Sequence, residues 1–129
     1  MAQPFLSVVI PAYNEEPRIS STLEQVIRFF STQPYSWEIV VADDGSEDAT
    51  GQVVGGLAVS NPNLRLLSLP HKGKGWAVKN AMLAASGQYR LLCDADLSVP
   101  IAQVERFLPP QMQGVDVGIG SREAEGARR

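Results

Sequence analysis

The fold of this chain depends on the stretch Tyr89-Arg-Leu-Leu-Cys-Asp-Ala-Asp-Leu-Ser98. An apolar run leads directly into two carboxylates, Asp94 and Asp96, which are spaced two residues apart. If the backbone is still extended there, the two-residue period of a strand directs both side chains to one side. Two like charges held that close repel each other, and oxygen ligands alone suit Mg²⁺ or Mn²⁺ rather than Zn²⁺. The pair therefore indicates half of a metal site, and the plain alternative is a solvated turn after a strand.

The composition indicates one globular domain, since 129 residues allow a single sizeable core. A hydrophobic content of 44% against 19% charged residues excludes a disordered chain. With 11 basic and 14 acidic residues the net charge is −3, so we expect no general attraction to nucleic acid. The single cysteine, Cys93, lies in an apolar run and is expected to be a small buried core residue. No apolar run approaches the length of a membrane span, and none is expected in this chain.

Apolar, β-branched runs alternate with helical patterns along the sequence. We expect strands at residues 5–10, 37–42, 64–69 and 115–119 and one that carries the two carboxylates, with helices after Asn14, near residue 47, at 75–85 and at 101–108. Pro11 is expected to end the first strand, Asn14 to cap the first helix and Gly87 to end the third helix. The second helix is expected to be short or frayed, because three glycines interrupt it and each costs roughly 1 kcal/mol relative to alanine.

This alternation predicts an α/β fold, a Rossmann-like three-layer sandwich in which helices cover both faces of a parallel sheet. In such sheets, ligands bind beyond the carboxyl ends of the strands, near the point where the strand order reverses. Polar segments follow three of the predicted strands, at residues 11–15, 43–46 and 94–96. The sequence therefore predicts one site that collects all of these segments.

The segment His71-Lys-Gly-Lys-Gly75 leads directly into the predicted third helix. Lys72 and Lys74 would then lie at the positive end of the helix dipole, where cations are disfavoured. A phosphate or diphosphate bound by helix N–H groups, with glycines that permit close approach, explains this placement. A solvated basic turn is an equally good interpretation, since the segment lacks the ending of a P-loop. His71 is expected to be a surface residue without a catalytic role.

The acidic pair Asp43 and Asp44 precedes a Gly-Ser turn. One of the two acids is expected to be a turn or cap residue, which leaves the other to accept a hydrogen bond from a nucleobase. Tyr13 can stack on a base or pack at the sheet edge, and Glu15 can simply serve the helix dipole. Together with the metal position and the diphosphate segment, these residues match the requirements of a nucleoside-diphosphate ligand.

Four motifs in this order resemble the family 2 glycosyltransferases of the GT-A fold. They are Ser7-Val-Val-Ile-Pro-Ala-Tyr-Asn-Glu15, Glu38-Ile-Val-Val-Ala-Asp-Asp-Gly-Ser46, Gly73-Lys-Gly75 and Asp94-Ala-Asp-Leu97. Their wording is most similar to the branch of dolichyl-phosphate and other polyprenyl-phosphate glycosyltransferases. The resemblance spans nearly the whole chain, as far as Gly118-Ile-Gly-Ser-Arg122.

The resemblance implies a site for a nucleotide sugar and its metal ion. It implies Pro11, Ala12, Tyr13 and Glu15 in the nucleotide pocket, Asp43 or Asp44 at the base, Lys74 near the diphosphate, and Asp94 and Asp96 on the nucleotide sugar and its Mg²⁺ or Mn²⁺. The implied reaction is inverting transfer of a hexose, with UDP-glucose favoured and GDP-mannose second, to an acceptor such as a polyprenyl phosphate. An acceptor that is already an anionic phosphate needs no strong general base, and no catalytic residue is assigned.

The resemblance also implies what surrounds this domain. Members of the family continue beyond the point where this chain stops, into an acceptor-binding part that often has amphipathic or membrane-spanning helices. We therefore expect residues 1–129 to form one donor-binding domain that lacks the acceptor part. We expect a cytoplasmic location, at or near the membrane face, and self-association through an exposed sheet edge.

Two alternatives belong to other functional classes. A nucleotide-binding or assembly module would keep the fold without catalysis, although the intact Asp94 and Asp96 argue against it. A dinucleotide-dependent oxidoreductase is disfavoured because no Gly-x-Gly-x-x-Gly follows the first strand. Sugar transfer would exclude the first alternative, and absence of NADH binding would exclude the second.

Overall fold

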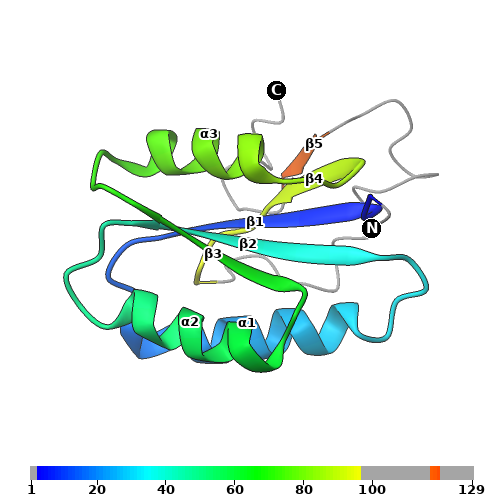
Figure 1. Cartoon of the computed structure of the whole chain (residues 1–129), viewed down its shortest axis with the longest axis horizontal. Helices are drawn as coiled ribbons and strands as arrows, with labels where there is room; N and C mark the ends of the chain where they lie inside the picture. Colours follow the sequence, from blue (N-terminus) through cyan, green and yellow to red (C-terminus); the bar gives the residue numbers. More distant parts are fainter. Residues whose placement is uncertain (1–2, 97–116, 120–129) are drawn as a thin grey trace.

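The computed structural model describes residues 3–96 and 117–119, which form a sheet of five strands between two layers of helices (Figure 1). The elements are β1 (Leu6–Ala12), α1 (Glu16–Phe30), β2 (Trp37–Asp44), α2 (Thr50–Ser60), β3 (Leu64–Leu69), α3 (Lys74–Ala84), β4 (Tyr89–Leu92) and β5 (Val117–Ile119). The strand order is β3-β2-β1-β4-β5, and all neighbouring strands are parallel. This confirms the predicted α/β fold, while the helix expected at 101–108 lies outside the described residues.

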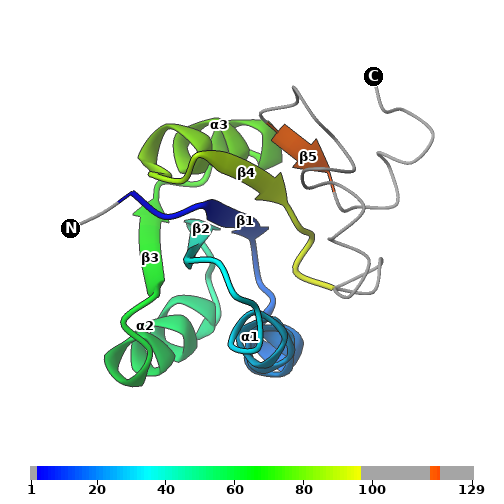
Figure 2. The ribbon, with the colours of Figure 1, turned by 90° about the vertical axis from the view of Figure 1, so that its right-hand side faces the viewer.

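Helices cover both faces of the sheet, with α1 and α2 on one face and α3 on the other (Figure 2). The face under α1 is filled by large buried side chains such as Val8, Ile10 and Phe30. The face under α3 is packed with buried alanines of that helix, Ala77 and Ala81. Because successive residues of a strand point to opposite faces, a strand covered on both sides is apolar throughout. The small side chains allow α3 to lie close to the sheet.

β1 is the central strand, and it continues through Pro11, where the sequence predicted its end. It pairs with β2 over its whole length but with β4 only as far as Val9 opposite Leu92. The Val9 carbonyl accepts from the Cys93 N–H at 2.9 Å, so the backbone of the odd-numbered residues faces β4. Pro11 therefore lies beyond the paired part of that edge, where a missing N–H costs no ladder bond.

α2 begins at Thr50, later than the expected start near residue 47, and continues for 11 residues through all of its glycines. Thr50 and Val54 are fully buried, so packing outweighs the low helix propensity of glycine. The expectation of a short or frayed helix is therefore not met. None of the helices in the described part of the chain is long and apolar enough to cross a bilayer.

A buried polar cluster ties the end of α3 to the amino ends of three strands. Glu38 on β2 is 9% exposed, and its carboxylate accepts from the Ser7 hydroxyl at 2.6 Å and from the Ser86 N–H at 2.7 Å. The Arg65 guanidinium on β3 donates to the same carboxylate at 3.1 Å. A buried carboxylate with several donors is satisfied. The cluster fixes the turn after α3 and so helps to set where the other end of that helix lies.

Gly87 lies against β1, and the expectation that it occupies the C′ position just after α3 is wrong, because Ala85 is the C-cap of that helix. That helix ends at Ala84, and Gly87 donates its N–H to the Ser7 hydroxyl at 2.7 Å. An added Cβ at Gly87 would lie 2.6 Å from the Ser7 nitrogen and 2.9 Å from the Leu6 carbonyl carbon. Both are backbone atoms, so any side chain requires the turn or β1 to shift. Close approach to β1 is therefore what requires glycine at this position.

Gly87→Ala is expected to lower the free energy of unfolding by about 1–3 kcal/mol, the usual effect of overpacking. Gly55→Ala on α2 is the matched control, because an added Cβ there meets nothing within 4 Å. The control should raise the free energy of unfolding by roughly 0.5–1 kcal/mol, since alanine favours the helix. Urea denaturation followed by circular dichroism measures both, and equal effects would contradict the close contact at Gly87.

Candidate functional site

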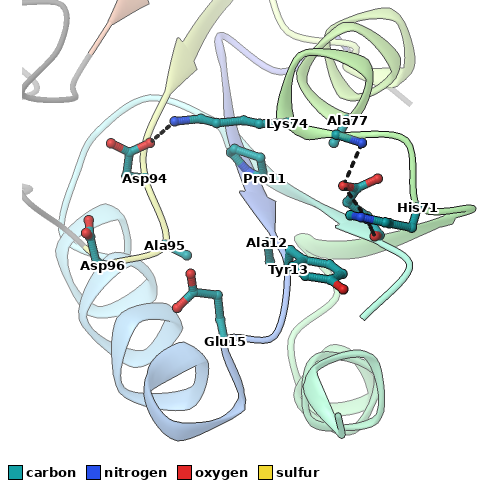
Figure 3. Close-up of a pocket in the computed structure, with 12 residues that line it drawn as sticks. Pro11, Ala12, Tyr13, Glu15, His71, Lys74, Ala77, Asp94, Ala95 and Asp96 are labelled. Atoms are coloured by element: carbon teal, nitrogen blue, oxygen red, sulfur yellow. Dashed lines mark hydrogen bonds and ion pairs between the residues drawn. The ribbon is translucent and has the colours of Figure 1, made fainter. Parts of the chain in front are cut away.

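A cavity of about 370 Å³ lies at the carboxyl ends of β1 and β4, where the strand order reverses (Figure 3). Its volume falls in the range of small-ligand sites. It is lined by Pro11, Ala12, Tyr13, Glu15, Asp44, His71, Gly73, Lys74, Ala77, Asp94, Ala95 and Asp96. The segments after β1 and β4, the end of β2 and the start of α3 thus meet at one place.

Every residue expected to contact a donor lines this cavity except Asp43. The Asp43 carboxylate accepts from the Ser46 N–H at 3.1 Å and from the Ser46 hydroxyl at 2.5 Å. Of the two adjacent acids, Asp43 therefore takes the turn role. Sequence reasoning did not assign four cavity residues, namely His71, Gly73, Ala77 and Ala95. Gly73 at least lies in the basic segment, whereas a buried alanine methyl carries no chemical signal in a sequence.

Asp94 lies in irregular backbone after β4, and Asp96 lies in the turn that begins at Ala95, so neither carboxylate is on a strand. β4 ends at Leu92, so the expectation that this strand carries the two carboxylates is wrong. Asp94 Oδ1 accepts from Lys74 Nζ at 3.1 Å, which links this turn to the start of α3. Asp94 and Asp96 lie on one side of the cavity, and Tyr13 and His71 lie on the other (Figure 3).

Arg18 on the first turns of α1 is held between acidic groups. Its Nε donates to Glu15 Oε1 at 2.7 Å. The hydrogen bond and the charge of Glu15 raise the pKa of the Arg18 guanidinium above its usual value, and the charge of Asp96 adds to this effect. Arg18 thus offsets negative charge from the segment after β1 and from the turn after β4.

Asp44 organises the loop that leads into α3. This side chain is only 3% exposed, and its carboxylate accepts from the N–H groups of Lys72 at 2.8 Å and Gly73 at 2.9 Å. His71 Nδ1 lies 3.0 Å from Asp44 Oδ2. Burial acts to raise the pKa of Asp44, but the two N–H groups and the His71 ring lower it below its usual value. Backbone N–H groups of the basic segment thus already have an anionic partner within the chain.

His71 also forms part of the cavity wall. Its ring stacks on the Tyr13 ring, with centroids 4.3 Å apart and planes at 21°. Gly45, with φ +69°, allows the loop to approach this closely, since an added Cβ would lie 2.6 Å from the His71 nitrogen. His71 is therefore exposed, as expected, but it belongs to the candidate site through Tyr13 and Asp44.

The loops before α1 and α2 cap each other. Asn14 was expected to cap α1, but its φ of 53° places it outside the helix, and its Oδ1 accepts from the Glu47 N–H at 2.8 Å. Asp48 caps α1 instead by accepting from the Glu16 N–H at 3.1 Å. Glu16 in turn accepts from the Ala49 N–H at 3.1 Å at the start of α2. Reciprocal capping holds the two loops beside the cavity together.

Comparison with known families identifies the chain. The model of glycosyl transferase family 2 matches residues 7–128. This chain belongs to that family. A dolichyl-phosphate β-glucosyltransferase of Dictyostelium discoideum is 38% identical over 130 residues, which cover 92% of this chain and 40% of the relative. The chain of this family 2 member thus spans about 40% of the length of that curated relative.

Solved structures of other glycosyltransferases have the same fold. A mannosyltransferase from Pyrobaculum calidifontis, solved with GDP-Man and Mn²⁺, has a TM-score of 0.68 at 29% identity, over 85% of this chain and 34% of that chain. Glucosyl-3-phosphoglycerate synthase from Mycobacterium tuberculosis, solved with Mn²⁺, UDP and glucosyl-3-phosphoglycerate, has a TM-score of 0.64 at 27% identity, over 86% of this chain and 40% of that chain. The sheet of this family 2 member is therefore of the GT-A type, as the resemblance implied.

The carboxylate oxygens at the cavity fit a hard divalent cation whose remaining ligands come from a bound phosphate group. Within residues 3–96 and 117–119, no group of three or more His, Cys, Asp or Glu side chains is placed to hold a metal ion. Asp94 and Asp96 offer carboxylate oxygens at the cavity. Mg²⁺ is commonly held by one or two carboxylates, with substrate phosphates and water completing its shell. The pair therefore suits Mg²⁺ or Mn²⁺ that arrives with a diphosphate.

Asp44→Asn is expected to lower the melting temperature at pH 7. As the pH is lowered into the acid range, the melting temperature of this variant should fall less than that of the wild type. Because the pKa of Asp44 is lowered in the folded chain, its contribution to stability is complete above the unfolded pKa of about 3.9. That contribution is lost as the pH falls through the folded pKa. Thermal unfolding from pH 7 to about pH 2 measures this, with Glu24→Gln on the exposed face of α1 as the control for charge. If the melting temperature of Asp44→Asn falls in acid as steeply as that of the wild type, the stabilising role of the Asp44 carboxylate is contradicted.

Proposed function

We propose that this chain binds the nucleotide-sugar donor of an inverting hexosyltransferase. The observation that carries the proposal is the cavity at which Tyr13, Lys74, Asp94 and Asp96 meet. An aromatic ring suits a nucleobase, a lysine suits a diphosphate, and paired carboxylates suit a divalent cation. Membership of glycosyl transferase family 2 supports the same assignment.

In this proposal, Tyr13 and Asp44 receive the nucleobase. Tyr13 is 37% exposed and is backed by the His71 ring, so the pair offers a flat surface at one end of the cavity. Pro11 and Ala12 line the wall beside it. Asp44 Oδ1 accepts the Lys72 N–H, and a carboxylate oxygen can accept a second hydrogen bond from a base N–H.

The diphosphate and its metal ion bind at the other side of the cavity, beside Lys74, Asp94 and Asp96. The Lys74 side chain is 51% exposed, and its partner Asp94 is 17% exposed, so the lysine can turn from the carboxylate to a phosphate oxygen. A bound Mg²⁺ or Mn²⁺ supplies charge stabilisation for the departing nucleoside diphosphate. Lys74 adds positive charge at the same place, where negative charge develops as the donor bond breaks.

The proposed reaction transfers the hexose with inversion at its anomeric carbon. An acceptor oxygen forms a bond to this carbon while the bond to the β-phosphate oxygen breaks, and the bonding electrons leave with the nucleoside diphosphate. A phosphate acceptor is already anionic, so the attacking oxygen needs little help from a general base. The contribution of this chain is to bind and orient the donor, and we assign none of its residues as a base.

We favour UDP-glucose as the donor and a polyprenyl phosphate as the acceptor. The name of the Dictyostelium relative, a dolichyl-phosphate β-glucosyltransferase, supports glucose as the sugar and a polyprenyl phosphate as the acceptor, and the Mycobacterium tuberculosis neighbour solved with UDP supports uridine as the base. The two solved neighbours contain a guanosine and a uridine nucleotide, so the GT-A sheet accommodates either base and GDP-mannose is the second donor to test. A lipid acceptor would also place the protein at a membrane surface, and we propose the cytoplasmic face.

A nucleotide-binding or assembly module without transfer activity is the second candidate. It would use the same cavity to bind a nucleotide. Donor binding is common to both candidates, so it does not separate them. Glucose transfer to dolichyl phosphate by a longer protein that contains this chain would exclude the second candidate.

Calorimetric titration with UDP-glucose and GDP-mannose tests donor binding by this chain. We expect one donor to bind in the presence of Mn²⁺, and EDTA to weaken that binding. The double variant Asp94→Asn/Asp96→Asn should weaken Mn²⁺-dependent binding by at least about tenfold, because it removes the charged oxygen ligands. Glu24→Gln is the control for lost charge, and circular dichroism checks that both variants fold. If neither UDP-glucose nor GDP-mannose binds with Mn²⁺ present, the proposal is refuted.

A further inference from the structure

Thr22 on α1 reaches the turn that carries the two carboxylates. Its hydroxyl donates to the Ala95 carbonyl at 2.5 Å, although the two residues are 73 positions apart. Thr22 and Ala95 are each 4% exposed, so this hydrogen bond is shielded from water. A threonine inside a helix usually directs its hydroxyl to a carbonyl of its own helix or to solvent. Thr22 instead binds a different element of the fold.

Packing holds Ala95 at the same place as the hydrogen bond. Ala95 belongs to the buried core cluster that includes Ile19 and Leu23 of α1. A buried carbonyl requires a hydrogen-bond donor, and Thr22 supplies one. The residue between the two aspartates is therefore tied to the α1 side of the sheet through both its methyl group and its carbonyl.

The position of Ala95 affects the aspartates on either side of it. The ladder between β1 and β4 reaches Leu92 opposite Val9, so the turn beyond it is not aligned by strand pairing in that ladder. Asp94 and Asp96 nevertheless both line the cavity (Figure 3). A rotation of the backbone at Ala95 would change how the Asp94 carboxylate is oriented relative to the Asp96 carboxylate.

We infer that Thr22 is a positioning residue for the Asp94 and Asp96 pair. Its hydrogen bond to the Ala95 carbonyl holds the turn so that both carboxylates meet one metal-diphosphate ligand. The inference rests on the proposed donor site, because it names what aligns the carboxylates there. Thr22 is not among the residues that line the cavity, so it acts through Ala95. Hydrogen-bonding partners behind metal ligands are typically worth about 10–100-fold in metal affinity.

Two pairs of variants isolate the hydroxyl. Thr22→Val keeps the branched shape of the wild-type residue and removes only the donor. Thr22→Ser and Thr22→Ala both lack the methyl group and differ from each other only in the hydroxyl, so they serve if Thr22→Val does not fold. Thr32→Val is the control, since the Thr32 hydroxyl donates to the Phe29 carbonyl at 2.8 Å at an exposed position after α1.

The first measurement is the Mn²⁺ concentration that gives half-maximal binding of UDP-glucose or GDP-mannose, whichever binds the wild-type chain. We expect Thr22→Val and Thr22→Ala to raise it by about tenfold or more. Thr22→Ser and Thr32→Val should stay within about twofold of the wild type. Binding of UDP or GDP without metal should change little, which separates a positioning role from a general loss of structure. A folded Thr22→Val variant with the wild-type Mn²⁺ requirement would overturn the inference.

The second measurement needs no donor. Backbone ¹⁵N relaxation of Ala95 and Asp96 in the free chain should show order parameters that fall from about 0.85 towards about 0.6 in Thr22→Val, but not in Thr32→Val. Unchanged order parameters would overturn the inference. If the wild-type chain binds no donor, the proposed function fails and these order parameters alone decide whether Thr22 positions the turn.

Discussion

Parallel pairing of β1 with β2 on one side and with β4 on the other sets where the candidate site lies. In a parallel sheet all strands end at the same edge, so the segments after Ala12, Asp44 and Leu92 come together there. The strand order reverses at β1, and α1 and α3 therefore lie on opposite faces (Figure 2). The cavity opens between segments that diverge at this reversal.

Charged side chains at the two edges of the sheet have different environments. At the amino edge, Glu38 accepts hydrogen bonds from three side-chain and backbone partners and serves to fix α3. At the carboxyl edge, Asp94 is paired with Lys74, whose side chain is 51% exposed. At the end of β4, burial, with the charges of Asp94 and Asp96, raises the pKa of the Cys93 thiol to about 12. Cys93 is thus a core residue, as predicted, and a poor nucleophile.

α1 connects the segment after β1 and the turn after β4 to the core. Its N-terminal region carries Glu15 and Arg18, and the next turn carries Thr22, which binds the Ala95 carbonyl. The core face of the same helix is fully buried against the sheet. Because the helix is rigid, the segment after β1 and the turn after β4 keep fixed positions relative to each other. The loop before α3 depends instead on Asp44, whose hydrogen bonds define its path.

The order of strands and helices, the apolar core and the acidic pair Asp94 and Asp96 can be predicted from local patterns, because periodicity and motif spacing are properties of neighbouring residues. Three features are visible only in the folded chain: β1 continues through Pro11, Asp44 and not Asp43 lines the cavity, and the Thr22 hydroxyl donates to the Ala95 carbonyl. Each of these depends on a partner that is distant in the sequence. Asp44 and Lys72 are 28 positions apart, and Thr22 and Ala95 are 73 apart. No local pattern encodes such pairs, because they meet only after the parallel sheet has brought their elements to one edge.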